Sequence, residues 1–468
     1  MPDAPLPAAA LPAVPSAPAS DAADDRGSPA APGGIGPAPH DPELPFASPF
    51  GESAGGVEDV VGTLPGEQPE PEEGLETELS LWAVVFAGGI GSRFWPLSTP
   101  ERPKQLLALV DERPLIAETV SRLAPTIPAH RVLVLTSADI APALHAAIPE
   151  VPEQNMLVEP RPMGTAAALA WGAHEIARRA GRQATFVAMH ADLAVGYPQE
   201  LRGLLRRAAV LTATERALIV VGTEPTRPET GFGYLVPGEP LEALDEHPPA
   251  TGGNGASAPH VEDALPEPGL PIPSPVPRAR LVPRRVRRYV EKPGPLLAEE
   301  LIADGAYWSA GIFVWQAGQV LDALAERTPE LEAGLAALAA GKLDRFAGLV
   351  QSVSVERGLL ERSPDLLVLP GEFGWDDVGT WASLRRVREL DDTGNGVWGS
   401  AHLVDASSCV VHADGGTTVV CYGVSGMLVV SRPGLTFVTT LDRAAELRPL
   451  LDQLPDDVAG RTRREPLL

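Results

Sequence analysis

The chain has 468 residues, 44% of them hydrophobic, so it is long enough for two or three domains, or for one large domain with tails, and for a large buried core. A formal net charge of −25 argues against nucleic acid as a partner, and only two cysteines, Cys409 and Cys421, argue against a disulfide framework. No apolar run reaches the roughly 18 residues of a membrane span, and the first ten residues lack a signal-peptide pattern, so we expect a soluble cytoplasmic protein with no membrane contact.

Residues 1–80 differ in composition from the rest of the chain. They hold 15 acidic residues and a single basic residue, Arg26, and they are rich in proline, alanine and glycine. A segment with so few large apolar side chains cannot bury enough surface to offset the entropy lost on ordering. We therefore predict a disordered acidic tail, with a partner-binding segment as the alternative.

A strand followed by a glycine-rich loop begins the predicted folded part, in the stretch Ala83–Gln105. Its first five residues, AVVFA, are apolar and predict a buried strand. Three glycines and two cations follow: Gly88, Gly89, Gly91, Arg93 and Lys104. The backbone N–H groups of such a loop can approach a phosphate closely, and the two cations add positive charge. The stretch predicts a triphosphate-binding loop, and a surface turn rich in glycine and proline is the alternative.

Two common phosphate-binding patterns do not fit this loop. The dinucleotide fingerprint G-x-G-x-x-G needs a glycine where Phe94 stands, and Pro96 interrupts the helix that should follow. The Walker pattern is absent here because no Lys-Ser or Lys-Thr pair follows a glycine. The pattern that remains is G-G-x-G-x-R and, further along, P-K.

Apolar runs alternate with helical stretches after the loop. Strands are predicted at 131–136, 184–192 and 217–223, and helices at 165–181 and 201–213. This alternation is typical of a Rossmann-like α/β fold, with a mainly parallel sheet covered by helices on both faces. Ligands of such sheets bind at the carboxyl ends of the strands, so the loop, Asp192 and Thr223 should line one crevice.

Residues 238–285 interrupt this order, because they are dense in Pro, Gly, Ala, Asp and Glu and show no periodicity. We predict a low-complexity insertion, which can be tolerated because loop entropy grows only logarithmically with length. Its arginine-rich end, which includes Arg278 and Arg285, is either a solvated flank or a patch for a partner or a phosphate.

The remainder of the chain predicts the end of the α/β domain and a smaller β domain. A strand at 286–291, a helix at 296–303, the segment 306–317 and helical material at 320–350 belong to the first. Short β-type runs between 397 and 440 alternate with turn residues, and a helix at 441–454 closes the chain. We therefore predict an α/β domain over 81–395 and a small β domain with the closing helix over 396–468.

Several motifs together resemble the sugar-1-phosphate nucleotidyltransferases, and the Phe-Trp-Pro-Leu-Ser continuation of the loop resembles their mannose-1-phosphate guanylyltransferase branch. The stretch 225–234, PTRPETGFGY, is similar to a family motif almost letter for letter, and residues 291–293 are similar to its E-K-P. The resemblance extends over residues 81–454. It implies a GT-A-like nucleotidyltransferase domain and β-helix-like coils in the C-terminal domain, which is also a candidate contact for a homodimer.

The resemblance implies a reaction between GTP and a hexose 1-phosphate, with α-D-mannose 1-phosphate favoured, that yields GDP-mannose and pyrophosphate. An oxygen of the sugar phosphate would attack the α-phosphorus of the nucleotide. That phosphate has a second pKa of roughly 6, so it needs no general base at neutral pH. Two anions must meet, so catalysis should depend on positioning, cations and a divalent metal, for which Mg²⁺ is expected.

Roles for the nucleotide-binding residues also follow from the resemblance. Arg93 and Lys104 would be the catalytic cations that brace the triphosphate. The loop glycines would bind the phosphates, and Glu159 and Thr165 fall where the family recognises the base. The sugar phosphate would be bound by a set drawn from three segments: Gly231, Gly233, Glu291, Lys292 and Ser309.

Two carboxylates, Asp192 and Asp377, match the family's metal-binding positions and would hold Mg²⁺. The residues alone leave other interpretations open. Asp192 could cap the segment that follows its strand, and Asp376 with Asp377 could cap the next helix.

The chain departs from the family pattern at several positions. Gly164 and Ser309 each replace an asparagine, His190 replaces a proline, and Glu356 replaces an aspartate. Ser309 and Glu356 fall near the expected sugar pocket. Two alternatives therefore remain: a nucleotidyltransferase for another hexose 1-phosphate, and a non-catalytic relative that binds a nucleotide sugar or regulates another protein.

Overall fold

The computed structural model describes residues 80–89, 91–241 and 281–460. The predicted acidic tail lies outside these residues except for Ser80, and so does the part of the predicted insertion between residues 242 and 280. Within the described residues, no helix combines the length and the apolar character that a membrane crossing requires.

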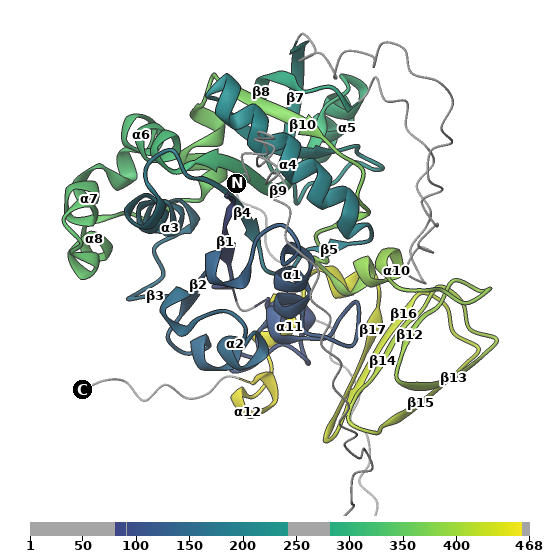
Figure 1. Ribbon diagram of the computed structural model, residues 1–468. Helices are drawn as coiled ribbons and strands as arrows, with labels where there is room; N and C mark the ends of the chain where they lie inside the picture. Colours follow the sequence, from purple (N-terminus) through teal and green to yellow (C-terminus); the bar gives the residue numbers. More distant parts are fainter. Residues whose placement is uncertain (1–79, 90, 242–280, 461–468) are drawn as a thin grey trace, which may run out of the picture. The chain divides into compact units, whose positions relative to one another are not determined.

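A nine-stranded sheet with the order β3-β2-β1-β4-β9-β6-β10-β8-β7 forms the centre of the α/β part (Figure 1). Its strands are β1 (Trp82–Phe86), β2 (Val132–Ser137), β3 (Met156–Glu159), β4 (Thr185–His190), β6 (Leu218–Thr223), β7 (Gly233–Pro240), β8 (Arg284–Glu291), β9 (Tyr307–Gln316) and β10 (Leu366–Pro370). The first four strands in this order pair in parallel, as do β6 and β10, whereas β9, β8 and β7 pair antiparallel with their neighbours. The prediction of a mainly parallel sheet was therefore wrong, because the sheet is mixed.

The antiparallel pairs involve two parts of the chain whose strand direction the apolar pattern could not predict. Strand β9 lies between β4 and β6 and runs opposite to both, and β7 and β8 pair as an antiparallel hairpin. A fully buried strand is a continuous apolar run whether its neighbours are parallel or antiparallel. The run Ile312–Trp315 therefore predicts burial but not direction.

Side chains of each central strand alternate between two helical layers, as the period of two requires. In β1, Val84 and Phe86 face a core formed with α3, whereas Ala83 and Val85 face a core formed with α1, α2 and α4. The helices of the first face are α3 (Thr165–Ala180), α6 (Ala317–Arg327), α7 (Pro329–Ala339) and α8 (Leu343–Leu349). Those of the second face are α1 (Leu115–Leu123), α2 (Ala141–Ala147) and α4 (Pro198–Glu215), and α5 (Pro295–Ala303) packs near β7.

The β7–β8 hairpin holds the two ends of the predicted insertion together. Strand β7 continues to Pro240 and β8 begins at Arg284, and these two residues are paired. The N–H of Leu241 donates to the carbonyl oxygen of Pro283 at 2.9 Å. Residues 238–240 and 284–285 therefore belong to strands, so the predicted limits of 238–285 were too wide.

Two small sheets make up the C-terminal part. Their strands are β12 (Gly396–Trp398), β13 (Ser400–Val404), β14 (Val410–Ala413), β15 (Thr418–Tyr422), β16 (Met427–Arg432) and β17 (Leu435–Thr440). Val410 pairs with Leu428 and Ser400 with Thr418, both in parallel and both 18 positions apart. Consecutive segments of this length thus stack on each other, while the β-helix-like assignment and the homodimer contact stay predictions.

The C-terminal strands share a core with the aromatic residues of the glycine-rich loop. Phe94 and Trp95 belong to the same buried cluster as Leu428 and Phe437, and the rings of Trp95 and Phe437 lie 5.1 Å apart. The indole N–H of Trp381 also donates to the carbonyl oxygen of Trp95 at 3.1 Å. The domain boundary at residue 395 stays a prediction, and this shared core crosses it.

The prediction of one helix at 441–454 was wrong. The chain instead forms a 3₁₀ helix (Arg443–Ala445) and two short α-helices, α11 (Arg448–Leu451) and α12 (Asp456–Ala459), the last beyond the predicted end. Pro449 and Pro455 explain the break, because proline starts a helix well but cannot continue one without losing a hydrogen bond.

Candidate active site

The glycine-rich loop follows β1 at the carboxyl edge of the sheet and packs against Lys104. Gly91 has a φ of +68°, which favours glycine, and a Cβ atom there would collide with Cβ of Lys104. Lys104 begins a short 3₁₀ helix (Lys104–Leu106) and is only 6% exposed. The next residue, Gln105, fixes the end of β1, because its amide donates to the carbonyl oxygen of Ala87 at 2.8 Å. Sequence reasoning did not identify Gln105, whose only signal was its place beside Lys104.

Lys104 joins the two segments that carry the predicted metal ligands. Its ammonium donates to Oδ2 of Asp192 at 2.8 Å and to the carbonyl oxygen of Asp377 at 3.0 Å. Burial acts to raise the pKa of Asp192, but Lys104 and then His190 lower it, and the pKa lies below its ordinary value. Asp192 thus meets a cation at the end of β4, which is the position that the sequence predicted for it.

Asp377 lies next to a second ion pair. Asp376, in the short strand β11 (Trp375–Asp376), pairs with Arg386 at 2.6 Å and accepts a hydrogen bond from the N–H of Val378 at 2.9 Å. Burial raises the pKa of Asp377 to about 6, and the nearby carboxylate of Asp376 adds to the rise. The alternative in which Asp376 and Asp377 cap a helix is wrong, since Thr380 caps the following 3₁₀ turn.

Arg93 approaches the same place from the glycine-rich loop. Its guanidinium donates to the carbonyl oxygen of Gly379 at 3.1 Å, and the side chain is otherwise exposed. A Cβ atom on Gly379 would collide with the carboxylate of Asp377 and lie 3.4 Å from the Arg93 guanidinium. The structure therefore brings together the four predicted charged groups: Arg93, Lys104, Asp192 and Asp377.

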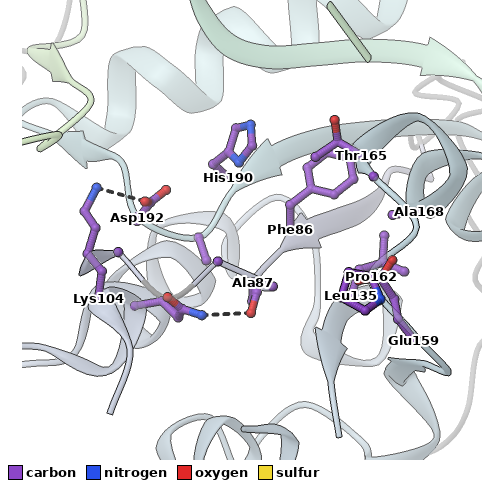
Figure 2. Close-up of a pocket in the computed structure, with 16 residues that line it drawn as sticks. Phe86, Ala87, Lys104, Leu135, Glu159, Pro162, Thr165, Ala168, His190 and Asp192 are labelled. Atoms are coloured by element: carbon purple, nitrogen blue, oxygen red, sulfur yellow. Dashed lines mark hydrogen bonds and ion pairs between the residues drawn. The ribbon is translucent and has the colours of Figure 1, made fainter. Parts of the chain in front are cut away.

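A cavity of about 320 Å³ lies beside the glycine-rich loop. Seven of the predicted site residues line it: Gly88, Gly89, Gly91, Lys104, Glu159, Thr165 and Asp192. Figure 2 shows the Lys104–Asp192 pair at one end and Glu159, Leu135 and Pro162 at the other. The cavity thus has a charged end and a largely apolar end. The apolar lining was not predicted, because apolar side chains in a pocket look like core residues in a sequence. His190 was not predicted as a site residue either, because the resembling family has a proline at this position.

Glu159 is the polar group of the apolar end. Its Oε1 atom is buried and has no hydrogen-bond partner among the described residues. Burial raises the pKa of this carboxyl group. A buried acceptor without a partner carries a desolvation cost that a ligand with matching donors can remove.

The start of α3 also lines the cavity, through Gly164 and Thr165. Gly164 has φ +85° and ψ 155°, and a Cβ atom there would lie 2.6 Å from the carbonyl oxygen of Val353. The hydroxyl of Thr165 accepts a hydrogen bond from the N–H of Val355 at 3.0 Å. Glycine therefore stands where the resembling family has asparagine because the segment around Val353 occupies the side-chain space.

The predicted sugar-phosphate residues form a second group, none of which lines the cavity. Gly233 pairs with Glu291 across β7 and β8, and the Glu291 carboxylate is 2.8 Å from the Lys292 ammonium. Ser309 is buried in β9. Gly231 lies outside β7 and is exposed, and its N–H donates to Glu229 at 3.2 Å.

Tyr289, which sequence reasoning missed, connects this second group. Its hydroxyl donates to Oε2 of Glu291 at 3.2 Å, and Ser309 is close enough to lower the pKa of Tyr289. A Cβ atom on Gly233 would collide with the Tyr289 oxygen. Burial, then the charges of Glu356 and Glu291, raise the pKa of Tyr289 well above its ordinary value. Only a buried tyrosine on a strand marked this position in the sequence, which is a common core pattern.

The described residues contain no cluster of three or more His, Cys, Asp or Glu side chains placed to hold a metal ion. Asp192 and Asp377 supply two carboxylates on the two segments that Lys104 joins. Mg²⁺ typically takes one or two protein carboxylates and completes its shell with substrate phosphates and water. The donor set therefore fits Mg²⁺ bound together with a phosphate ligand.

Known proteins are similar to this chain over most of its length. Residues 82–255 and 279–393, more than half of the chain, match the model of the family described as nucleotidyl transferase. The chain is 29% identical over 391 residues to the xanthan biosynthesis protein XanB of Xanthomonas campestris pv. campestris (strain B100), covering 81% of this chain and 74% of that protein. It is 27% identical over 396 residues to a mannose-1-phosphate guanylyltransferase of Klebsiella pneumoniae, and the match covers 82% of this chain and 76% of that protein.

A solved structure extends the comparison to three dimensions. The crystal structure described as mannose-1-phosphate geranyltransferase from Thermus thermophilus has 30% sequence identity and a TM-score of 0.66. The match covers 80% of this chain and 98% of that one. This chain therefore belongs to the nucleotidyl transferase family and is an enzyme of that family.

Proposed function

We propose that the protein transfers a guanylyl group from GTP to α-D-mannose 1-phosphate and releases pyrophosphate. The observation that carries this proposal is the two-ended cavity, with the Lys104–Asp192 pair at one end and, at the other, the Glu159 carboxylate, whose Oε1 atom has no hydrogen-bond partner among the described residues. The relatives named mannose-1-phosphate guanylyltransferase support the choice of substrates.

The reaction forms one bond and breaks one bond at the α-phosphorus. An oxygen of the sugar phosphate attacks that phosphorus, and the bond to the oxygen bridging the α- and β-phosphates breaks. The electron pair of the broken bond leaves with pyrophosphate. The sugar phosphate is mostly dianionic at neutral pH, so no protein base is required. The protein's task is to position two anions and to neutralise their charge.

Lys104 and Arg93 supply positive charge from the loop side. Lys104 is already fixed by Asp192 and by the backbone of Asp377, so it can meet a phosphate without losing further side-chain freedom. Arg93 is exposed, and among the described residues it donates to a single carbonyl oxygen, so it can turn toward the triphosphate. Asp192 and Asp377 would hold Mg²⁺, which neutralises phosphate charge when bound.

Glu159 is the proposed reader of the base. Guanine presents two adjacent donors, its ring N–H and its 2-amino group, whereas adenine presents no such pair on that edge. A carboxylate accepts such a pair with both oxygens. We expect Glu159→Gln to reduce kcat/KM for GTP about ten- to hundred-fold, the value of a hydrogen bond to a charged group. Glu153→Gln, at an exposed site nearby, is the control and should leave GTP use unchanged.

A pyrophosphate-release assay tests the whole proposal. Each of GTP, ATP, UTP and dTTP is paired with mannose, glucose and galactose 1-phosphates. Turnover with GTP and mannose 1-phosphate above all other pairs supports the proposal. Turnover only with another nucleotide or sugar refutes the assignment of substrates, and the absence of turnover with every pair refutes the catalytic proposal in favour of a non-catalytic relative.

A different hexose is the second candidate, and one observation favours it. The sugar-side group places Ser309 and Glu356 close enough to Tyr289 to act on its pKa, Ser309 lowering it and Glu356 raising it. Ser309 is shorter than the asparagine of the resembling family, and Glu356 is longer than its aspartate. The hydrogen-bonding atoms of these two side chains therefore lie at different distances from a bound sugar. The same substrate panel separates the two candidates, because only the identity of the sugar differs.

A further inference from the structure

His190 is the one imidazole in the cavity lining among the described residues, and the reaction described above does not use it. It is the last residue of β4 and stands two positions before Asp192. Its ring lies 5.4 Å from the ring of Phe86 at an interplanar angle of 43°. In Figure 2 it lies between the Lys104–Asp192 pair and the end of the cavity that holds Thr165.

The opposite side of His190 faces β9, the strand that carries Ser309. The β4–β9 register ends with Met189 opposite Ile312, which places His190 beside Gly311. A Cβ atom on Gly311 would lie 3.3 Å from Cδ2 of His190, and the φ of Gly311 is +66°. Glycine at this position thus leaves room for the imidazole. His190 therefore lies at the junction of the nucleotide cavity and the sugar-side residues.

The imidazole has a donor to offer at this junction. It is half-buried, and neither ring nitrogen has a hydrogen-bond partner among the described residues. Lys104, by contrast, already donates to Asp192 and to the backbone of Asp377. The resembling family has proline where His190 stands, and proline offers no side-chain donor.

We propose that His190 touches the substrate, with an imidazole N–H donating to a non-bridging oxygen of the phosphorus that is transferred. This inference rests on the proposed function, because it needs a nucleotide in the cavity and a sugar phosphate beside β9. The transferred phosphorus belongs to the nucleotide and is the atom that the sugar phosphate attacks. The two substrates must therefore meet at it, and His190 lies at the junction of their two sites. A hydrogen bond there strengthens as charge develops in the transition state, so it acts on kcat.

Two substitutions separate the donor from the ring. His190→Phe keeps an aromatic ring against Phe86 but has no donor, whereas His190→Gln keeps an N–H donor without the ring. We expect kcat of His190→Phe to fall about ten- to hundred-fold, the effect of one hydrogen bond to a charged group, with KM for each substrate changed less than about three-fold. His190→Gln should stay within about five-fold of wild type. His402→Ala, at an exposed site on β13, is the control and should match wild type.

The outcomes are distinct. A fall in kcat in His190→Phe, together with a kcat close to that of wild type in His190→Gln, supports the proposal. Equal losses in the two variants, or a normal kcat with phenylalanine, overturn it, and so does a loss confined to KM for the nucleotide. Thermal melting of each variant shows whether it is folded, and pyrophosphate exchange with the purified nucleotide sugar gives a second measurement of the same step. If the wild-type enzyme turns over no substrate pair, the proposed function fails. If the wild-type enzyme is active and both variants have the same kcat as wild type, only the role of His190 is refuted.

Discussion

Replacing either glycine that flanks α3 by alanine should destabilise the protein, and Gly164→Ala should do so more than Gly181→Ala. The two residues share almost the same backbone conformation, with φ +85° and ψ 155° at Gly164 and φ +87° and ψ 161° at Gly181. This region of backbone space is nearly restricted to glycine, so an alanine costs about 1–3 kcal/mol at either site. The two sites differ in the space around them.

The space at Gly164 is filled by backbone. A Cβ atom there would lie 2.6 Å from the carbonyl oxygen and 2.8 Å from the nitrogen of Val353, and neither atom can turn away as a side chain does. Around Gly181 nothing lies within 4 Å of such an atom. Forcing a methyl group into a packed site costs about 1–3 kcal/mol. The difference between the two variants should therefore be about 1–3 kcal/mol, with Gly164→Ala the less stable.

Urea unfolding of both variants and of wild type measures this difference, provided that the three slopes agree. A second measurement follows from position, since Gly164 and Thr165 line the nucleotide cavity. We expect KM for the nucleotide to rise in Gly164→Ala and to stay unchanged in Gly181→Ala. Equal destabilisation in the two variants would refute the steric argument, because backbone strain alone predicts that result.

Three further changes give separate tests. Asp192→Asn should reduce kcat at least a hundred-fold and raise the Mg²⁺ concentration for half-maximal rate, and a near-normal rate would exclude the metal role. Burial, then Arg388, lower the pKa of His412 to about 3, so the unfolded chain takes up a proton below about pH 6.5 that the folded protein does not. Stability should fall as pH falls, by about 2 kcal/mol at pH 5 from this residue, and thermal melts of His412→Gln should lack that part of the loss. Gly233→Ala should displace Tyr289 and raise KM for the sugar phosphate while leaving KM for the nucleotide unchanged, and an unchanged sugar KM would contradict the proposed sugar side.

The parts of the site that the sequence predicted are those encoded locally. The loop glycines, Lys104 and Asp192 each stand in a short motif at the end of an apolar run, and β1 and β4 are adjacent parallel strands. Their meeting at one edge therefore followed from the α/β pattern alone. The antiparallel pairing of β9 could not be predicted in this way, because a buried strand has the same apolar pattern whether it runs parallel or antiparallel to its neighbours.

The parts that were missed depend on pairs distant in sequence. Tyr289 and Ser309 meet because β8 and β9 both lie beside β7, and His190 lies over Gly311 because β9 is antiparallel to β4. No short pattern carries such a pairing. The helix-cap interpretation of Asp376 failed for a related reason, since Arg386, ten positions later, binds its carboxylate and Thr380 caps the turn.

The β7–β8 hairpin is closed by strand pairing at the point where the connecting segment begins. Pro240 pairs with Arg284, and Leu241 bonds Pro283, so the sheet ends in a completed ladder at that point. Gly233 and Glu291 sit at the other end of the same two strands. We therefore expect a change in the length of the connecting segment to leave Gly233 and Glu291 in place, which makes this position suitable for attaching a reporter or a binding domain.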